Sequence, residues 1–375
     1  WRGRRRGGVG AQELWGAGAA GRGGRGQGVS GRAAGSPGAA GACSHVRQGG
    51  NTPCGASRYH RPMWTAVSLW AFNLAALALY AAIAARKIAV GGSPVPWIVG
   101  LLLLYFGLML LLCASYFGIA WIWRARRPRD VRLRLRGMLW LWWREYAALA
   151  GAPPRLMLYR LLVRDPAPAR IEMPVVLLHG VLCNAGVWVP LVRHLRRKGV
   201  RGVYSLSYGP PLASIDAFAD QLADKIGAIV AVTGARQVMI VAHSMGGLVA
   251  RAYIRTHGTA MLARVLTIGA PHHGSMHAWF FPGTSLAQIR PGNAWLAALN
   301  RERVDPSLRF VSLWSWHDSM VAPQTSSELP GAVDVALVGI GHNALLGEPE
   351  VFAYALDEIR AAERNAGHEC GSEMQ

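Results

Sequence analysis

Ser244 is the residue of this chain best placed to act as a nucleophile. It follows the apolar run 238–242 and precedes a segment of helical pattern, 248–253. A serine at so tight a strand-to-helix turn needs residues with almost no side chain two positions before and after it, and Ala242 and Gly246 satisfy this need. The pattern predicts a nucleophile elbow, although an ordinary turn with a buried serine has the same signature.

A base and an acid for this serine occur further along the chain. His342 follows an apolar run and two glycines, and Asp318 follows the apolar run 310–316. A serine hydroxyl needs a base to take its proton, and the imidazole needs a carboxylate to fix its tautomer. Asp305 and Asp334 are rival acids. Both precede their strands, however, and are expected at the wrong end of the sheet, so we predict Asp318.

Backbone donors for a developing oxyanion are expected after the apolar run 173–178, which ends in His179 and Gly180. Gly180 allows close approach of the backbone. We therefore predict the N–H groups of Val181 and of Met245, the residue after the nucleophile, as the oxyanion hole. His179 is interpreted as a structural residue of this loop, because His342 is the better base.

Together these motifs resemble those of bacterial lipases and esterases (triacylglycerol-lipase-like) of the α/β-hydrolase superfamily, over residues 173 to about 362. Four matching segments follow one another in the family's order: Ala242-His243-Ser244-Met245-Gly246, Gly269–Ser275, Asp318 with Val321 and Pro323, and Gly341-His342. The resemblance implies Ser244, Asp318 and His342 as catalytic triad. It also implies support of the elbow and oxyanion loop by His179, Gly180, Ala242, His243 and Gly246.

Two departures from the family pattern are visible. Ala242 stands where glycine is more usual, and no acidic residue of the kind that binds calcium in some larger members follows His342 closely. We therefore expect no metal and no cofactor. The cysteines show neither a disulfide framework nor a zinc spacing; they are Cys43, Cys54, Cys113, Cys183 and Cys370.

The hydrophobic pattern predicts an α/β fold with a doubly wound, mostly parallel sheet, the α/β-hydrolase fold, over residues 173–363. Strands are expected near 174–178, 202–207, 237–242, 264–269, 309–314 and 334–339, and helices near 185–198, 214–232, 246–257, 292–300 and 348–363. The aromatic segment 276–290 is expected either to form a lipid-facing lid or to pack on the core. Residues 364–375 are interpreted as a tail.

Residues 1–62 contain 18 glycines and ten arginines against one acid, which predicts a disordered extension. Its Arg-Gly tracts could bind RNA, but aromatic residues are sparse. We favour the interpretation that translation starts at or near Met63.

Residues 63–123 predict a transmembrane hairpin ahead of the fold. The runs 64–85 and 96–123 each reach the roughly 20 residues needed to cross a bilayer. The first run also fits a signal sequence, with small residues at 81–85.

Residues 124–172 are interpreted as a basic, Trp-rich juxtamembrane segment. Seven arginines against one acid lie within 124–136, and arginines that flank a membrane span stay on the cytoplasmic side. The segment 138–146 is expected to lie at the headgroups as an interfacial helix. These sequences predict a multi-pass protein of the inner (cytoplasmic) membrane with its catalytic domain on the cytoplasmic side. Because most of the net charge of +20 lies before residue 137, nucleic acid is not expected as a partner.

The sequence as a whole predicts a membrane-anchored serine hydrolase that cleaves carboxylic esters of lipids through an acyl-enzyme, with lipid ester and bilayer as partners. An acyltransferase or thioesterase would use the same triad. A non-catalytic membrane-bound binding module is a further alternative, which the complete triad disfavours.

Overall fold

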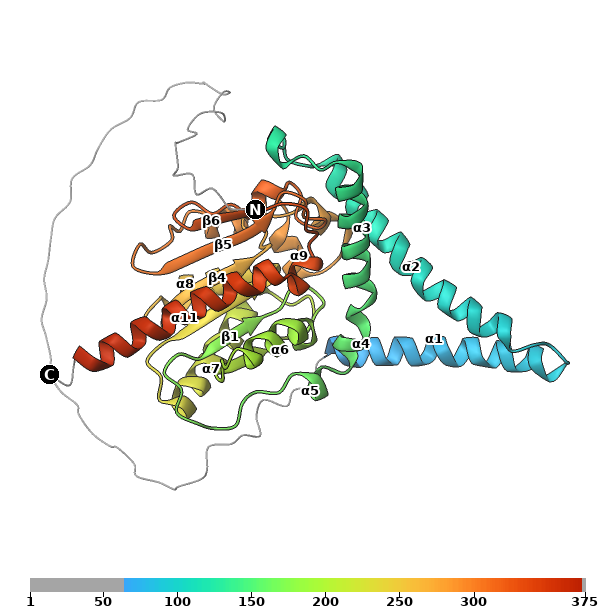
Figure 1. Ribbon diagram of the computed structural model, residues 1–375, viewed down its shortest axis with the longest axis horizontal. Coiled ribbons are helices and arrows are strands. Elements are labelled where there is room, and N and C mark those ends of the chain that lie inside the picture. The colour runs from blue at the N-terminus through green and yellow to red at the C-terminus, as the bar shows by residue number, and fades with distance from the viewer. Residues whose placement is uncertain (1–63, 373–375) are drawn as a thin grey trace, which may run out of the picture. The chain divides into compact units, whose positions relative to one another are not determined.

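A computed structural model describes residues 64–372. Its centre is a six-stranded sheet in which every neighbouring pair is parallel and the order is β2-β1-β3-β4-β5-β6 (Figure 1). The strands are β1 Val175–Leu178, β2 Val203–Leu206, β3 Val238–His243, β4 Leu262–Ile268, β5 Arg309–Ser315 and β6 Val333–Leu337. The chain reverses its direction of winding between β1 and β3, and at such a switch point the loops at the carboxyl ends of the strands form a crevice.

Helices cover both faces of the sheet, as the burial of β1 and β3 on both faces requires. One face packs mainly against α6 and α11, and the other against α7, α8, α9 and α10. These helices are α6 Val189–Arg197, α7 Ile215–Thr233, α8 Met245–His257, α9 Thr284–Ile289, α10 Ala294–Leu299 and α11 Pro349–Ser372. Five short 3-10 helices are η1 Arg129–Val131, η2 Ala185–Trp188, η3 Met276–Phe280, η4 Gln324–Ser327 and η5 Ala344–Gly347.

The doubly wound parallel sheet predicted from the sequence is confirmed. Each strand lies within two residues of its expected position at both ends, and α7 and α8 lie close to the expected helices 214–232 and 246–257. Helix α9 was not expected, because the aromatic segment around it shows no helical period. Helix α11 continues to Ser372, so it includes most of the segment interpreted as a tail.

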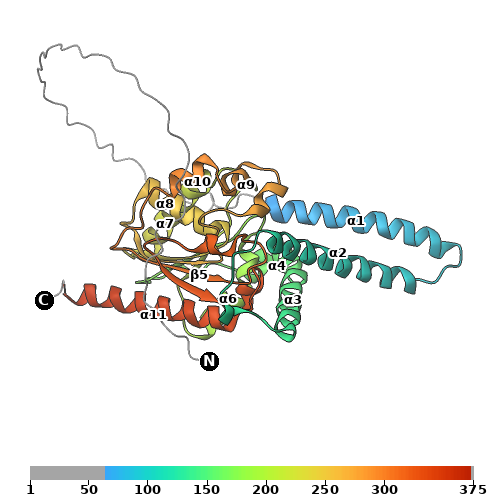
Figure 2. The same cartoon turned by 90° about the horizontal axis from the view of Figure 1, so that it is seen from above.

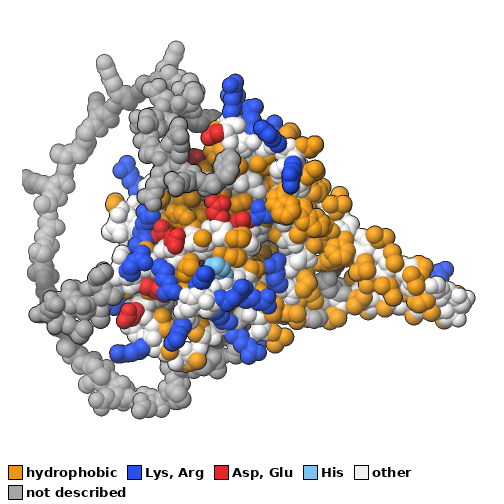
Figure 3. Space-filling model, in the orientation of Figure 1, with side chains coloured by type: hydrophobic (Ala, Val, Ile, Leu, Met, Phe, Trp, Pro, Cys, Tyr) orange, Lys and Arg blue, Asp and Glu red, His pale blue; other side chains and the backbone are white. Residues whose placement is uncertain are grey.

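Ahead of the sheet lie α1 Trp64–Ala89, α2 Val95–Ile122, α3 Leu135–Ala150, α4 Ala152–Met157 and α5 Tyr159–Leu162. Helices α1 and α2 meet at a turn and extend away from the sheet, as Figures 1 and 2 show. The space-filling view shows hydrophobic side chains gathered over them (Figure 3).

Within residues 64–372, α2 is the one helix that is both long and apolar enough to cross a bilayer. The expectation of two spans is therefore not supported. Helix α1 forms where the first span was expected, but it includes Asn73, Arg86 and Lys87, which make it more polar than α2. The predicted extension 1–62 lies outside the described residues.

Helix α3 includes the segment expected at the headgroups, and it has two different faces. Leu141, Glu145 and Leu149 recur every four residues and are buried, whereas Trp140 and Trp143 are 59% and 58% exposed. A spacing of four places the buried residues on one stripe of the helix. That stripe contacts η5, the short helix that follows His342, so α3 packs against the region of the predicted triad.

Candidate active site

Ser244 lies between β3 and α8 in the backbone conformation that an elbow requires. Its φ is 55° and its ψ is −127°, a strained combination for a residue with a side chain. A Cβ on Gly246 would lie 2.7 Å from the carbonyl oxygen of Leu178 and 2.8 Å from that of His179. Glycine is thus required here because α8 passes directly against the end of β1. Ala242 is fully buried in β3, where its methyl group is accommodated.

Asp318 and His342 form a buried pair. The distance from Nδ1 of His342 to Oδ2 of Asp318 is 2.8 Å, and each residue is only 2% exposed. The second carboxylate oxygen, Oδ1, accepts hydrogen bonds from the backbone N–H groups of Met320 and Val321, at 2.7 Å each. The carboxylate is therefore fixed by the turn after β5 and can orient the imidazole ring.

The electrostatic environment of His342 favours its protonated form. Burial of the imidazole lowers its pKa, but the charge and hydrogen bond of Asp318 together with the charge of Glu145 outweigh burial, so the pKa of His342 is raised above 6.5. A histidine in such a setting is a stronger base, which suits the transfer of a proton from a hydroxyl.

The loops that carry the three predicted triad residues meet at the carboxyl ends of the strands. His243, the neighbour of Ser244, has its Nε2 atom 3.3 Å from the carbonyl oxygen of His342, and their rings lie 4.6 Å apart. Gly269 follows β4 on the other side, where a Cβ would lie 3.2 Å from Oδ2 of Asp318. The predicted Ser244, Asp318 and His342 thus lie in one cluster of loops.

The two predicted oxyanion donors belong to one small pocket. Val181 and Met245 both line it, together with Gly180. A Cβ on Gly180 would lie 2.9 Å from Cβ of Ser244. The absence of a side chain therefore lets the loop after β1 approach the nucleophile as closely as an oxyanion hole demands.

His179 has a structural environment that does not suit a general base. Its ring stacks on Tyr208 at 4.1 Å, its Nδ1 atom lies 2.8 Å from the carbonyl oxygen of Gly180, and its own carbonyl accepts a hydrogen bond from the Tyr208 hydroxyl. Complete burial lowers the pKa of His179 to about 4. The imidazole is accordingly neutral near pH 7 and holds the oxyanion loop in place.

The rival acids lie elsewhere. Asp305, in the loop before β5, accepts hydrogen bonds from Ser307 and Thr259. Asp334, at the start of β6, accepts one from the N–H of Leu329. Asp305 precedes β5 and Asp334 lies at the amino end of β6, whereas His342 follows the carboxyl end of β6.

The segment Gly269–Ser275 connects the site to the acid loop. The Ser275 hydroxyl donates to the carbonyl of Met320 at 2.6 Å and accepts from the N–H of Ala322 at 3.1 Å. His272 is fully buried, with Nε2 at 3.1 Å from the Thr267 hydroxyl. Among residues 64–372 no group of three or more side chains is arranged to hold a metal ion.

The aromatic segment after Ser275 lies partly in the core and partly on the surface. His277 is buried in η3, with Nε2 at 3.1 Å from the carbonyl oxygen of Tyr116 in α2. Trp279 and Phe280 are each 55% exposed, and the Phe280 ring lies 6.1 Å from that of Trp123. The segment thus packs partly on the core and also presents aromatic rings beside α2, and the lipid-facing lid stays a prediction.

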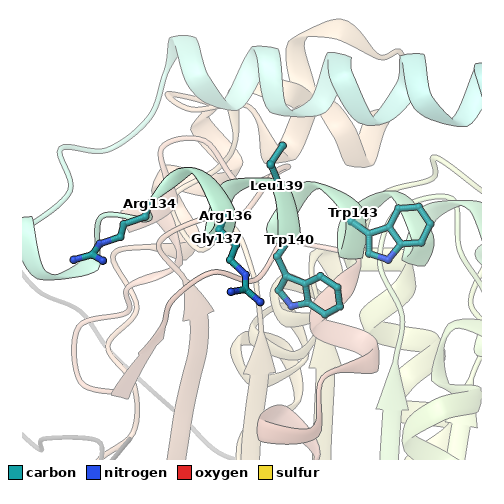
Figure 4. A pocket seen from close by; sticks show the side chains of 6 residues that line it. All are labelled: Arg134, Arg136, Gly137, Leu139, Trp140 and Trp143. Atoms are coloured by element: carbon teal, nitrogen blue, oxygen red, sulfur yellow. The ribbon is translucent and has the colours of Figure 1, made fainter.

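A larger surface pocket lies away from the triad, along α3 (Figure 4). It is lined by Arg134, Arg136, Gly137, Leu139, Trp140 and Trp143. Its lining combines arginine side chains with two exposed tryptophans and includes none of the predicted triad residues.

Glu145 is a residue of the site that sequence reasoning missed. It lies on α3, is fully buried, and accepts a hydrogen bond from the hydroxyl of Ser319, the neighbour of Asp318. One signal was available, since an acid within a Trp-rich apolar segment is unusual. Its partner could not be read from the sequence, because the two residues are 174 positions apart.

A parallel sheet with a serine on a strand-to-helix turn, followed along the chain by an aspartate and then a histidine, is typical of the α/β-hydrolase fold. The model of the "Alpha/beta hydrolase family" matches residues 175–366. Because this match covers half of the chain, the protein belongs to the alpha/beta hydrolase family.

Two curated relatives are triacylglycerol lipases. The one from Burkholderia plantarii is 29% identical over 160 residues, which are 40% of this chain and 44% of the relative. The one from Pseudarthrobacter phenanthrenivorans is 31% identical over 119 residues, 30% of this chain and 37% of the relative. The chain thus spans less than half the length of the curated relatives it matches.

Solved structures with a similar fold include Aspergillus fumigatus lipase B, with 19% identity and a TM-score of 0.47 over 54% of this chain and 57% of that one. Another is the mature lipase BlEst2 of Bacillus licheniformis, with 19% identity and a TM-score of 0.44 over 52% of this chain and 95% of that one.

Proposed function

We propose that this protein is a serine carboxylester hydrolase of the lipase or esterase type. The observation that carries the proposal is the buried Asp318–His342 pair, 2.8 Å apart, in the same loop cluster as the strained Ser244 elbow. A nucleophile, a base and a group that orients the base are the three parts that acyl transfer requires.

In the proposed reaction, Oγ of Ser244 attacks the ester carbonyl while Nε2 of His342 takes the hydroxyl proton. The same proton passes to the alkoxide, which leaves as the alcohol. Water then attacks the acyl-Ser244 ester, again with His342 as base, and releases the carboxylic acid. Asp318 holds the Nδ1–H tautomer of the imidazole and stabilises the imidazolium that forms in each step.

Backbone N–H groups of Val181 and Met245 are proposed to bind the carbonyl oxygen as it becomes negative. Met245 is the first residue of α8, and the N-terminus of a helix carries partial positive charge. Donors fixed by the fold stabilise the transition state without having to reorganise.

A lipid ester is the substrate class that we propose. Aromatic residues around the site, including the exposed Trp279 and Phe280, offer an apolar surface for an acyl chain. The curated relatives named triacylglycerol lipase support the same class.

We also propose that α2 anchors the protein in a bilayer with the hydrolase on the cytoplasmic side. The seven arginines of residues 124–136 follow α2 directly, and such clusters remain in the cytoplasm. The exposed tryptophans of α3 would then lie at the inner headgroups (Figure 4), which keeps the site near its lipid substrate.

The proposed reaction is tested with purified full-length protein, p-nitrophenyl esters of graded chain length and a fluorophosphonate probe. Wild type should hydrolyse the esters and become labelled at Ser244. Ser244→Ala should neither hydrolyse the esters nor become labelled, while its thermal unfolding stays close to that of wild type. Turnover at the wild-type rate in Ser244→Ala would exclude Ser244 as the nucleophile.

A further inference from the structure

Glu145 is a fully buried carboxylate that accepts hydrogen bonds from the loop after Asp318 and from the loop after His342. Its Oε1 atom accepts hydrogen bonds from the Ser319 hydroxyl at 2.6 Å, from the Asn343 N–H at 3.1 Å and from Nδ2 of Asn343 at 2.9 Å. Its Oε2 atom accepts one from the N–H of Ala344 at 2.9 Å. An ionised carboxylate is an acceptor-only group, and four donors converge on this one, three at Oε1 and one at Oε2.

The residues that donate these bonds are the chain neighbours of the catalytic pair. Ser319 directly follows Asp318, and Asn343 directly follows His342. The Ser319 hydroxyl oxygen also lies 3.4 Å from the backbone N of His342. Glu145 therefore connects the loop that follows Asp318 with the loop that follows His342.

Gly341 provides a second, independent sign of this arrangement. A Cβ at this position would lie 2.4 Å from Oε2, 2.7 Å from Cδ and 3.0 Å from Cβ of Glu145. Contacts below 3.0 Å force one of the two groups to move. The glycine before His342 thus leaves the space that the Glu145 side chain occupies.

Glu145 comes from a part of the chain that the family match does not include, since that match begins at residue 175. Helix α3 contacts both η5 behind His342 and the apolar helix α2. The positions of Asp318 and His342 are accordingly connected, through Glu145, to the segment that precedes the hydrolase domain.

We propose that Glu145 is a positioning residue of the active site, which fixes the acid and histidine loops in their reactive geometry and links them to helix α3. This inference rests on the proposed function, because the geometry that it preserves is that of the triad. A misplacement of catalytic groups by about 1 Å can cost roughly 10² in rate, so loss of this carboxylate should be visible in kcat.

The charge of Glu145 has a consequence that packing alone would not have. The titratable groups that face His342 are Asp318 in the loop after β5, His243 at the end of β3, His277 in η3 and Glu145 in α3. Burial lowers the pKa of His342, Asp318 raises it most, and Glu145 raises it further. Removing the negative charge at position 145 should therefore lower the pKa of His342.

The test uses the full chain with Glu145→Gln, which keeps size and shape but replaces an acceptor with a donor and removes the charge. We expect kcat to fall at least tenfold with KM little changed, and the acid limb of the kcat/KM profile to move to lower pH. The matched control is Tyr146→Phe, the next residue on α3, whose hydroxyl donates to the carbonyl of Phe106 in α2 rather than to the triad loops. Its kcat and pH profile should equal those of wild type.

The pKa of His342 is also measured directly, from the downfield Nδ1 proton and ring signals in histidine NMR, assigned with a His342→Gln variant. This readout is independent of turnover. An inactive, unlabelled wild type would contradict the proposed function, and the His342 titration in Glu145→Gln would still decide the role of Glu145. An unchanged pKa together with unchanged kcat would overturn the inference.

Gly341→Ala separates the contact with Glu145 from the effect of charge. Alone, the added methyl should displace the Glu145 side chain and lower kcat in a similar way to Glu145→Gln. In a Glu145→Ala background the same methyl should lower kcat by a much smaller factor, because the carboxyl group is gone. Equal effects of Gly341→Ala in both backgrounds would contradict the proposed contact.

Discussion

The carboxylate of Asp318 is held from two directions, and this determines how it can act on His342. One oxygen lies 2.8 Å from Nδ1 of the imidazole, and the other accepts two backbone N–H groups of the turn after β5. The carboxylate cannot rotate without breaking these bonds. The imidazole is thereby kept in the tautomer that carries a proton on Nδ1 and leaves Nε2 as the acceptor.

Asp318→Asn should retain the fold but lower kcat by roughly 10⁴, because an amide can stabilise the wrong tautomer of His342. The measurement is ester hydrolysis by the purified variant, with thermal unfolding to confirm that it is folded. Asp334→Asn and Asp305→Asn are matched controls, since both acids lie near the amino ends of their strands, away from His342. If either of them causes the larger loss, Asp318 is not the acid of the triad.

The pH dependence of turnover follows from the raised pKa of His342. The imidazole must be neutral to take the serine proton, so activity falls as pH drops through the pKa of this residue. Because Asp318 raises that pKa above 6.5, the midpoint of the acid limb of kcat/KM should also lie above 6.5. In Asp318→Asn the residual activity should show this limb at lower pH. A wild-type midpoint well below 6.5 would show that another group controls the limb.

The sequence was sufficient to predict the sheet, and the structure brings the three residues of the predicted triad into one cluster of loops. Strands β1 and β3 are continuous apolar runs, and the residues that follow them must meet at the carboxyl edge of a parallel sheet. Local sequence therefore determines where the loop after β1 and Ser244 are placed.

Contacts between distant segments were not predictable in this way. Glu145 finds its donors on residues 319 and 343 only after α3 has packed on the domain, and nothing in the pattern around it specifies that partner. The expectation of a span at α1 has a different explanation, because the polar residues of this helix are visible in the sequence. Its apolar run satisfied a length criterion, although Asn73, Arg86 and Lys87 lie within the helix that forms.

Gly246→Ala should impair both folding and activity, since its Cβ would lie 2.7 Å from the Leu178 carbonyl oxygen. Backbone at the end of β1 cannot move without displacing the oxyanion loop. We expect a loss of about 1–3 kcal/mol in the free energy of unfolding, the usual cost of overpacking, and a marked fall in kcat. Urea unfolding and ester hydrolysis measure the two effects.

The control for this glycine is Gly227→Ala, in the interior of α7, where a Cβ would meet nothing within 4 Å. Alanine is the better helix former there, so this variant should be as stable as wild type or about 0.5–1 kcal/mol more stable. Equal tolerance of the two substitutions would mean that Gly246 is not in close contact with β1.

The orientation of the catalytic domain is the last prediction, and it depends on the arginines of residues 124–136. Moving seven guanidinium groups across the bilayer opposes the strongest orientation signal in this chain. With α2 as the span, these arginines and everything after them should remain in the cytoplasm. Green fluorescent protein fused after Gln375 should then fluoresce, and a phosphatase that is active only in the periplasm should be inactive at the same point. Replacing the seven arginines with glutamine should weaken this preference. Replacing seven exposed arginines of the catalytic domain should leave it unchanged; these are Arg193, Arg196, Arg197, Arg201, Arg301, Arg303 and Arg309. Phosphatase activity without fluorescence in the unaltered chain would place the hydrolase on the outer side and expose it to a different set of lipid esters.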